Sequence, residues 1–307
     1  MKILITGGSG FIGSHLVKFW QMPNVDVIIF DRQKPPERLL GYNYTFIQGT
    51  ITDRERVAKV MIGVDYVFHL AAEISVPESM DNPLKYYGTN TIGTIIMLEE
   101  AEKAKVKHFV FASSSANYGF GLRIPKKETM LLRPKCPYAF TKIDGEYMCE
   151  LFRKERGLKT TSLRFFNVYG EGQNPDAQYA AAVPKFVQQC LNQEKITLFG
   201  GSQTRDFIYV GDIVKGMVFC VVNNIQGIFN LGTGKNITIE NLAILIRNLT
   251  KSISIIEYLP ERAGDVPVGL ASMRRLEKRG FKCDNTLEQG IQKVIEYFQN
   301  PSSFDSE

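Results

Sequence analysis

The first thirteen residues constrain the fold more than any other part of the chain. An apolar run over residues 3–6 predicts a buried strand, and the glycine-rich turn after it, GGSGFIG, opens into a helix predicted over residues 11–21. Backbone N–H groups at a helix start have no partners within the helix and can bind an anion. Glycine lets the backbone approach a phosphate closely. The opening segment is therefore suited to a diphosphate.

The spacing of this turn, G-x-x-G-x-x-G, is weak evidence by itself because the chain has 26 glycines. The next apolar run, residues 25–30, ends at Asp31, where a carboxylate can bind the ribose hydroxyls of NAD and repel a 2′-phosphate. Arg32 beside it leaves NADP open. We expect a dinucleotide site that uses NAD; the alternative is a strand, turn and helix without a ligand.

Composition excludes several classes of protein. The 307 residues are 44% hydrophobic and 22% charged, with a formal net charge of +5, as is typical of a globular enzyme. No basic cluster is interleaved with aromatic residues, so we expect no nucleic-acid partner. No run of about 18 apolar residues occurs, so we expect no membrane span. A strand that starts at Lys2 leaves no room for a signal peptide.

Cysteine and histidine give no sign of disulfides or of a metal site. The five cysteines are scattered and lack C-x-x-C spacing, which favours a reducing cytoplasm. His15, His69 and His108 lie on different predicted elements. We therefore expect a cytoplasmic protein without a bound metal.

Apolar runs alternate with helical segments through the first half of the chain. The predicted strands are residues 3–6, 25–30, 44–48, 66–69, 108–112 and 160–165, and the predicted helices are 11–21, 53–61, 83–104 and 137–156. Buried strands separated by helices predict a doubly wound parallel α/β sheet of the Rossmann type. Ligands of such sheets bind at the carboxyl ends of the strands.

The pattern changes after about Val168. Residues 169–182 predict a long loop, and a strand is predicted at 196–199, with helices at 183–192, 239–249, 273–279 and 287–298. We expect residues 1–167 to form the NAD-binding domain and residues 168–307 mainly a smaller α/β lobe that binds substrate. Within the second part, residues 206–231 are expected to rejoin the first domain, with 206–209 and 227–231 as strands and 211–222 as a helix.

Tyr138 and Lys142 suggest chemistry within the helix predicted over 137–156. Residues four apart share a helix face, so the ammonium would lie beside the phenol and favour the phenolate. A tyrosine that works at neutral pH needs its pKa lowered by roughly 3 units from ~10, or about 4 kcal/mol. Such pairs are common, and an exposed helical pair is the alternative.

Ser113, Ser114 and Ser115 follow the strand predicted over 108–112. A hydroxyl here can bind a substrate oxygen that gains and loses a proton, although serine also forms turns after strands. The order serine, tyrosine, lysine along one chain favours the chemical interpretation.

With these motifs in place, the chain resembles the extended short-chain dehydrogenases/reductases of the NAD-dependent epimerase/dehydratase type. Within them it is most similar to the nucleotide-sugar 4-epimerases that act on UDP-glucose or UDP-N-acetylglucosamine, over almost its whole length. The matching segments are 6–13 (TGGSGFIG), 69–72 (HLAA), 90–94 (NTIGT), 113–119 (SSSANYG), 138–142 (YAFTK), 163–170 (LRFFNVYG), 203–210 (QTRDFIYV) and 262–266 (RAGDV).

The resemblance implies a 4-epimerase that retains NAD. Tyr138 would take the proton of the sugar 4-hydroxyl, Lys142 would assist it and anchor the ribose, and Ser114 would orient the substrate. Hydride would pass from C4 to NAD, and the 4-keto sugar would turn and be reduced on its other face. The resemblance also implies a homodimer, in which the helices predicted at 83–104 and 137–156 pair across a twofold axis.

The resemblance also implies which residues bind the cofactor and the substrate. Those implied for NAD are Gly7, Gly10, Phe11, Ile12, Gly13, Asp31, Arg32, Thr50, Ile51, Leu70, Ala71, Ala72, Asn90, Ser113, Tyr138, Lys142 and Phe165. Those implied for the UDP-sugar are Ser114, Tyr138, Asn167, Val183, Thr197, Phe199, Arg205, Arg262, Asp265 and Gly269.

Arginine would bind the substrate diphosphate, because a guanidinium fits phosphate with two parallel hydrogen bonds. Asn167 and Arg205 are implied for this contact, with Arg262 and Asp265 nearby. The backbone of residues 197–199 is implied to meet the uracil. An exposed ion pair between Arg205 and Asp206 is the alternative for that arginine.

Four positions depart from the family pattern or refine it. Thr50 stands where the family often has an aspartate that contacts adenine. Ser115 and Ala116 replace the acidic residues of related dehydratases and decarboxylases, which favours simple epimerisation. Gly269 leaves room for an N-acetyl group, although it also suits a turn. The alternatives are a nucleotide-sugar 4,6-dehydratase, a decarboxylase, an NADP-linked reductase, or a non-catalytic NAD(P)-sensing protein.

Overall fold

The computed structural model describes residues 1–121, 123–176, 181–261 and 266–300. They form two compact units, each assembled from three segments of the chain. The first unit takes Met1–Gly119, Leu131–Phe165 and Val214–Phe229, and the second takes Phe120–Met130, Phe166–Ile213 and Asn230–Glu307. Within the described ranges, no helix combines the length and the apolar character needed to cross a membrane.

A parallel sheet organises the first unit. Its strands are β1 (Lys2–Thr6), β2 (Asp26–Asp31), β3 (Thr45–Gln48), β4 (Tyr66–His69), β5 (His108–Ser114), β6 (Thr160–Phe165) and β11 (Gly227–Leu231). The seven strands run in the order β11-β6-β5-β4-β1-β2-β3. The chain thus builds outward from β1 on both sides, and a crevice forms where the direction of winding changes, between β1 and β4. This confirms the predicted doubly wound α/β fold.

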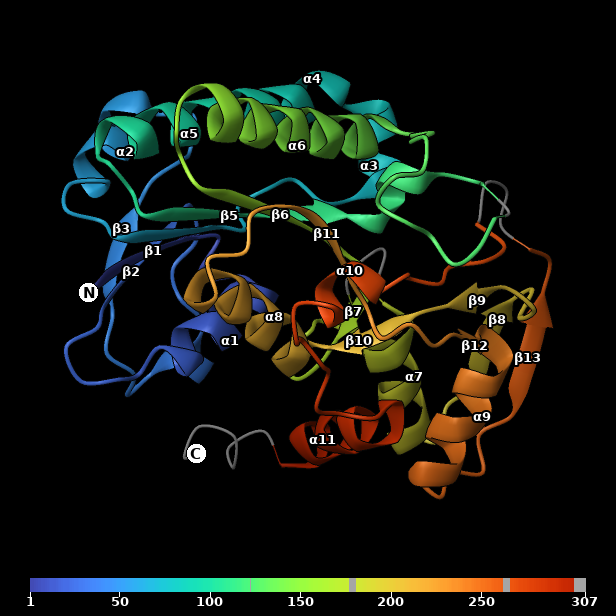
Figure 1. The fold of residues 1–307 in the computed structure, drawn as a ribbon. Coiled ribbons are helices and arrows are strands. Elements are labelled where there is room, and N and C mark those ends of the chain that lie inside the picture. The colour runs from blue at the N-terminus through green and yellow to red at the C-terminus, as the bar shows by residue number, and fades with distance from the viewer. Residues whose placement is uncertain (122, 177–180, 262–265, 301–307) are drawn as a thin grey trace. The chain divides into compact units, whose positions relative to one another are not determined.

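Helices cover both faces of this sheet, as Figure 1 shows for α5 and α6 on one face and α1 on the other. The helices of this unit are α1 (Phe11–Phe19), η1 (Glu37–Leu39), α2 (Arg54–Val60), α3 (Val76–Asp81), α4 (Pro83–Tyr86), η2 (Tyr87–Ile92), α5 (Gly93–Lys103), η3 (Ser115–Tyr118) and α6 (Pro137–Glu155), with part of α8 (Val210–Val222). The helix predicted over 83–104 is interrupted, because η2 is a π-helical segment between α4 and α5.

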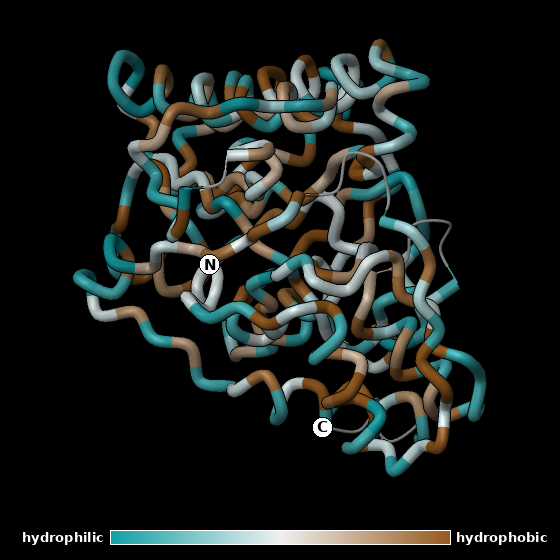
Figure 2. The backbone as a smooth tube through the Cα atoms, turned by 90° about the vertical axis from the view of Figure 1, so that its right-hand side faces the viewer, coloured by the Kyte–Doolittle hydropathy of each residue, from teal (hydrophilic) through white to brown (hydrophobic). Residues whose placement is uncertain are grey.

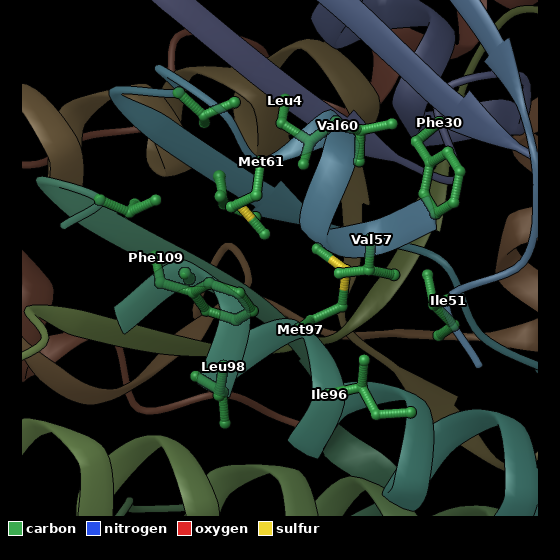
Figure 3. Packing of buried hydrophobic residues seen from close by; sticks show 14 of the residues in the cluster. Leu4, Phe30, Ile51, Val57, Val60, Met61, Ile96, Met97, Leu98 and Phe109 are labelled. Carbon is green, nitrogen blue, oxygen red and sulfur yellow. The ribbon is translucent and has the colours of Figure 1, made fainter. Parts of the chain in front are cut away.

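A hydrophobic cluster joins α2 and α5 to the sheet (Figure 3). Val57 from α2 and Met97 from α5 are both fully buried there, together with Leu4 of β1 and Phe109 of β5. Figure 2 shows why the helices can pack in this way: along them, the tube changes between hydrophobic and hydrophilic colours every few residues. One apolar stripe per helix is enough to bury it against the sheet.

The second unit is built from short strands and separate helices. Its elements are β7 (Asn167–Tyr169), α7 (Ala182–Leu191), β8 (Ile196–Phe199), β9 (Thr204–Arg205), β10 (Phe207–Tyr209), β12 (Ile237–Thr238), α9 (Ile239–Leu249), β13 (Ile256–Leu259), α10 (Arg274–Glu277) and α11 (Leu287–Gln299). Its strands pair as β7 with β10, β8 with β13 and β9 with β12. Helices α7, α9 and α11 pack against one another.

Of the two strands in residues 206–231 that were expected to rejoin the large sheet, one does and the other does not. The strand predicted at 227–231 does join the large sheet as β11, beside β6. The strand predicted at 206–209 does not: it is β10, which pairs in parallel with β7, so that Phe207 lies opposite Asn167. The backbone hydrogen bonds that a place in the large sheet would need are made with β7 instead.

Candidate active site

The turn between β1 and α1 requires glycine at two positions. Gly7 has φ +70°, and a Cβ on it would lie 2.7 Å from the backbone nitrogen of Ala71. A Cβ on Gly13 would lie 2.2 Å from the carbonyl oxygen of Gly7. Gly10 is the N-cap of α1 and has no side chain to cap the free N–H groups. The helix N-terminus can therefore approach an anion closely.

Asp31 and Arg32 lie at the end of β2, beside this turn. The two carboxylate oxygens of Asp31 accept hydrogen bonds from the backbone nitrogens of Ser9 and Gln33, both at 3.0 Å. The guanidinium of Arg32 is 2.7 Å from a carboxylate oxygen of Glu73, just beyond β4. Arg32 is thus paired with Glu73 in an exposed ion pair, and Asp31 is the group at this position that can bind ribose hydroxyls.

Other residues implied for NAD lie at the same edge of the sheet. The backbone nitrogen of Leu70 donates to the carbonyl oxygen of Thr6, and that of Ala71 to the Thr6 hydroxyl. Ala72 lies three residues after the end of β4, and Thr50 two residues after the end of β3; both are partly buried. The side chain of Ile51 packs in the hydrophobic cluster.

The amide of Asn90 is fully engaged within the protein. Its oxygen accepts from the Glu73 backbone nitrogen at 2.8 Å, and its nitrogen donates to the Glu73 carbonyl oxygen and to the Thr141 hydroxyl at 2.9 and 3.0 Å. Asn90 therefore holds the segment after β4 against α6. The cofactor contact expected for this residue stays a prediction, as does that of Phe165 at the end of β6.

Tyr138 and Lys142 share one face of α6 and meet the carboxyl end of β5. The ammonium of Lys142 lies 5.9 Å from the centre of the Tyr138 ring and donates to the carbonyl oxygen of Ala112 at 2.9 Å. The Tyr138 hydroxyl lies close to Ser114, whose hydroxyl accepts from the backbone nitrogen of Ala116. Serine, tyrosine and lysine are thus brought together at one strand end, as their order along the chain predicted.

The pKa values of the pair depart from the simple expectation. Burial raises the pKa of the Tyr138 phenol, and the hydrogen bond with Ser114 opposes this in part. The sequence predicts a phenol whose pKa Lys142 lowers; the larger effect is desolvation, which disfavours the phenolate. Burial lowers the pKa of Lys142 to about 8, while Cys149 and Glu146 act in the opposite direction.

Two charged residues beside this trio were not assigned a role from the sequence. Glu146 follows Lys142 by one further helical turn and forms a buried ion pair with Arg164 of β6, at 2.7 Å. The hydroxyl of Ser113, expected on the cofactor side, donates to Glu146 at 2.5 Å. The sequence signal that points to Glu146 is its spacing, because residues 138, 142 and 146 lie four positions apart along the helix.

In the second unit, three of the implied substrate residues lie close together. The backbone nitrogen of Asn167 donates to the carbonyl oxygen of Asp206, which follows Arg205 directly. The backbone nitrogen of Gly269 donates to the carbonyl oxygen of Thr204, on the other side of Arg205. One guanidinium nitrogen of Arg205 donates to the Thr204 and Val266 carbonyl oxygens at 2.9 and 2.6 Å.

Asp206 is buried, so an exposed ion pair with Arg205 is excluded. Its carboxylate accepts four hydrogen bonds at 2.7–3.0 Å, from the Thr233 nitrogen and hydroxyl and from the backbone nitrogens of Gly234 and Ala271. Burial raises the pKa of Asp206, and these hydrogen bonds oppose the rise. The residue thereby links the loop at Thr233 and Gly234 to the segment at Ala271.

The remaining substrate residues are placed separately. Val183 is fully buried in α7, and Thr197 and Phe199 lie on β8, which pairs with β13 rather than with β9 or β10. Arg262 and Asp265 lie outside the described residues. The contacts expected of these five residues stay predictions.

A cavity of about 550 Å³ opens in the second unit beside Arg205. Phe207 and Tyr209 of β10 line it, together with Thr233 and Asn236 from the loop that Asp206 holds. Its lining also includes the acidic residues Glu277, Asp284 and Glu288, and of the implied substrate residues that the structure describes only Arg205 lines it.

Residues 3–232 match the model of the NAD dependent epimerase/dehydratase family. The chain belongs to this family. Among curated relatives, a putative UDP-glucose 4-epimerase of Methanocaldococcus jannaschii is 34% identical over 97% of this chain and 98% of its own length. A UDP-glucuronic acid decarboxylase 1 of Danio rerio is also 34% identical, over 97% of this chain and 72% of its own length.

A solved epimerase structure is similar over nearly the whole chain. It is the UDP-N-acetylglucosamine 4-epimerase of Methanobrevibacter ruminantium M1 in complex with UDP-N-acetylmuramic acid, with a TM-score of 0.93 and 34% identity, covering 98% of both chains. Family membership makes NAD the expected cofactor. The uncapped start of α1, the two required glycines and the carboxylate at the end of β2 fit a dinucleotide.

Proposed function

We propose that the protein is an NAD-dependent 4-epimerase of a UDP-hexose. The observation that supports this most directly is the meeting of Ser114, Tyr138 and Lys142 at the end of β5, in the same unit as the glycine turn of α1. When bound, NAD supplies the reversible oxidation of the sugar 4-hydroxyl to a ketone.

Tyr138 is proposed as the group that takes and returns the proton of the 4-hydroxyl. Ser114 holds that oxygen by a hydrogen bond and fixes the phenol against it. The ammonium of Lys142 favours the phenolate, against the desolvation that raises its pKa. Lys142 is anchored by the Ala112 carbonyl oxygen, so its charge stays in place while the proton moves.

The first unit is proposed to bind NAD and the second to bind the UDP-sugar, so the boundary between the two tasks falls near residue 166. Arg205 and Asn167 are proposed for the diphosphate, with Arg262 and Asp265. Val183, Thr197 and Phe199 are proposed for the nucleotide. A large substituent at the sugar C2 is accommodated beside Gly269, so the N-acetylated pair is proposed as a substrate along with UDP-glucose.

The test is to incubate the purified protein separately with UDP-glucose, UDP-N-acetylglucosamine and UDP-glucuronic acid, and to identify the products by NMR and mass spectrometry. An epimerase inverts C4, leaves the mass unchanged and produces no net reduced nicotinamide. Loss of water, or oxidation of added NADPH, would instead identify a dehydratase or a reductase. A protein that binds the dinucleotide but turns over no sugar would be a sensor of the same fold.

A decarboxylase is the second candidate, because one relative of equal identity carries that name. The residues argue against it. Ser115 and Ala116 start η3 directly after Ser114, and neither side chain is acidic. Loss of carbon dioxide from UDP-glucuronic acid would establish this candidate in place of the epimerase.

We further propose a homodimer in a reducing cytoplasm. Phe140, Tyr147 and Leu151 are exposed on α6, and Leu84 and Ile92 are exposed on the neighbouring α4 and η2. Several large apolar side chains exposed on adjacent helices are typical of an interface. All five cysteines are free, as a reducing compartment requires. Sedimentation should give a dimer, and Tyr147→Glu with Leu151→Glu should give a monomer; an unchanged mass would contradict this interface.

A further inference from the structure

Three side chains on one face of α6 contact three consecutive residues of β5. Tyr138 lies close to Ser114, Lys142 donates to the carbonyl oxygen of Ala112, and Glu146 accepts from the hydroxyl of Ser113. The helix positions are four residues apart, so they form a single stripe. The stripe fixes the helix against the strand end at three points.

Glu146 is the most heavily bonded member of this stripe. Besides Ser113, its carboxylate accepts from the amide of Asn117 at 2.9 Å and from two guanidinium nitrogens of Arg164 at 2.8 and 2.7 Å. Arg164 also donates to the hydroxyl of Tyr118 at 2.9 Å, and Asn117 donates to Ser113 at 3.1 Å. One carboxylate therefore links α6, β5, β6 and η3.

The linked segments are those that carry the proposed chemistry. Ser114 lies between Ser113, at the end of β5, and η3, which contains Asn117; Glu146 holds both neighbours. Glu146 and Arg164 are each 2% exposed. A buried ion pair stabilises little by itself, since desolvation offsets the attraction, but it costs much to break on one side. Here the ion pair contributes by fixing the positions of the segments that it links, and not by adding much stability.

We propose that Glu146, neutralised by Arg164, is a positioning residue that fixes Ser114 against Tyr138 and sets the charge around Lys142. The inference rests on the proposed epimerase function for its catalytic consequence. Its electrostatic consequence at Lys142 is independent of turnover, because it depends only on the arrangement of charges in the first unit.

The titratable and charged groups facing Lys142 come from three elements. On α6 they are Tyr138, Glu146 and Cys149; on β4 and β6 they are His69 and Arg164. Burial lowers the pKa of His69 to about 3, and burial raises the pKa of Cys149 to about 12, so both are neutral at neutral pH. Of these groups, Glu146 carries the charge that acts directly on Lys142 at that pH, and Arg164 acts through its ion pair with Glu146.

Substitutions at the two ends of the pair should therefore move the pKa of Lys142 in opposite directions. The Glu146 charge favours the ammonium, so Glu146→Gln should lower the pKa of Lys142 below its value of about 8. Arg164→Met should raise it, because the carboxylate is then no longer neutralised. Each change is expected to be about one pH unit. A loss of packing alone would not be expected to shift the pKa of Lys142 in opposite directions in the two variants.

The measurement is the pH titration of the Lys142 side-chain signal by NMR of protein carbon-13-labelled at lysine, with the signal assigned by its loss in Lys142→Met. Arg164→Lys keeps the charge and should leave the pKa of Lys142 near the wild-type value. Ser113→Ala keeps both charges and cuts one link to β5, so it should leave that pKa unchanged and lower kcat about tenfold with little change in KM.

Glu100→Gln is the matched control. Glu100 is also a buried glutamate of the first unit, paired with Arg54 and Lys103 at 2.9 and 2.7 Å, and it makes none of the contacts of the stripe. It should lose stability but keep kcat and the Lys142 titration. Glu146→Gln should lower kcat by about tenfold to a hundredfold.

The outcomes separate the two proposals. Opposite shifts at Glu146 and Arg164 support the positioning role, even if the wild type epimerises no sugar tested. Shifts of equal sign, or shifts no larger than in Glu100→Gln, overturn it, even if the wild type is an active epimerase. If Arg164→Met does not fold, Glu146→Gln and Ser113→Ala still decide, because the first must move the Lys142 titration and the second must not.

Discussion

Each unit holds a buried carboxylate next to its candidate site, and the two are stabilised differently. Glu146 is neutralised by the side chain of Arg164, whereas the hydrogen bonds to Asp206 come from backbone nitrogens and a threonine hydroxyl. The first arrangement fixes side chains relative to one another. The second fixes loops, at Thr233 and Gly234 and at Ala271, two residues after Gly269.

From this difference we expect the two regions to control different kinetic constants. Chemistry depends on the placement of the Tyr138 hydroxyl to within a fraction of an ångström, so the first region should act on kcat. Affinity depends on the shape and charge of a binding surface, so the second region should act mainly on KM. Four substitutions test this division, in decreasing order of expected effect.

Tyr138→Phe should have the largest effect. Removing the hydroxyl that moves the proton should lower kcat by about a thousandfold while KM changes little. Tyr147→Phe is the matched control on the same helix, since Tyr147 is exposed and lies outside the stripe on α6. Steady-state kinetics with NMR detection checks both. A Tyr138→Phe enzyme with nearly full activity would remove the basis of the proposed function.

Arg205→Met should have the second largest effect, and it should act on KM rather than on kcat. Losing a guanidinium that binds a diphosphate should raise KM by roughly tenfold to a hundredfold, because hydrogen bonds to charged groups are worth about 1.5–3 kcal/mol. The value of kcat at saturation should stay within a few-fold. Lys251→Met, at an exposed position of the same unit, serves as the control. A fall confined to kcat would contradict the division.

Asp206→Asn should act on stability before activity. The amide nitrogen of asparagine would face N–H donors, and a buried donor left without an acceptor costs about 1–3 kcal/mol. Urea unfolding should show this loss, with a modest rise in KM and an unchanged affinity for NAD. Glu194→Gln, at an exposed position, should change neither. Unchanged stability in Asp206→Asn would mean that its four hydrogen bonds are not what holds the loops.

Gly269→Tyr should have the smallest effect on overall activity and should act on selectivity. A Cβ at Gly269 would lie 3.5 Å from the Thr204 carbonyl oxygen and 3.7 Å from the Arg205 side chain, an ordinary contact distance. The larger ring should reduce kcat/KM for UDP-N-acetylglucosamine about tenfold more than for UDP-glucose. Gly269→Ala should not discriminate. Equal losses on both sugars with the tyrosine variant would defeat the assignment.

The sequence predicts the first unit better than the second, for physical reasons. Strands β1, β2, β4 and β5 are largely buried apolar runs in the first half of the chain, separated from one another by longer polar or helical stretches. The two-residue strands β9 and β12 are too short to show any periodicity. The short helix α3 begins with Ser75 as its N-cap and Pro77 in its first turn, which is a readable signal that was missed.

Candidate residues follow the same division. Tyr138, Lys142 and Ser114 could be found because spacing on a helix and position at a strand end bring them together. Glu146 and Arg164 could not be assigned, since a charged residue on a helix or strand is ordinarily solvated. Asp206 was weighed as part of an exposed pair, and its burial depends on loops distant in the chain, near Thr233 and Ala271.

The interleaving of the two units limits how this protein can be divided. The edge strand β11 completes the large sheet from a position after residue 226, far beyond β6, its neighbour. A polypeptide ending near Phe165 would leave β6 without that partner and present an unprotected strand edge to other molecules. The amino-terminal half is therefore no autonomous cofactor-binding fragment, and during synthesis its sheet is finished only after most of the chain has left the ribosome.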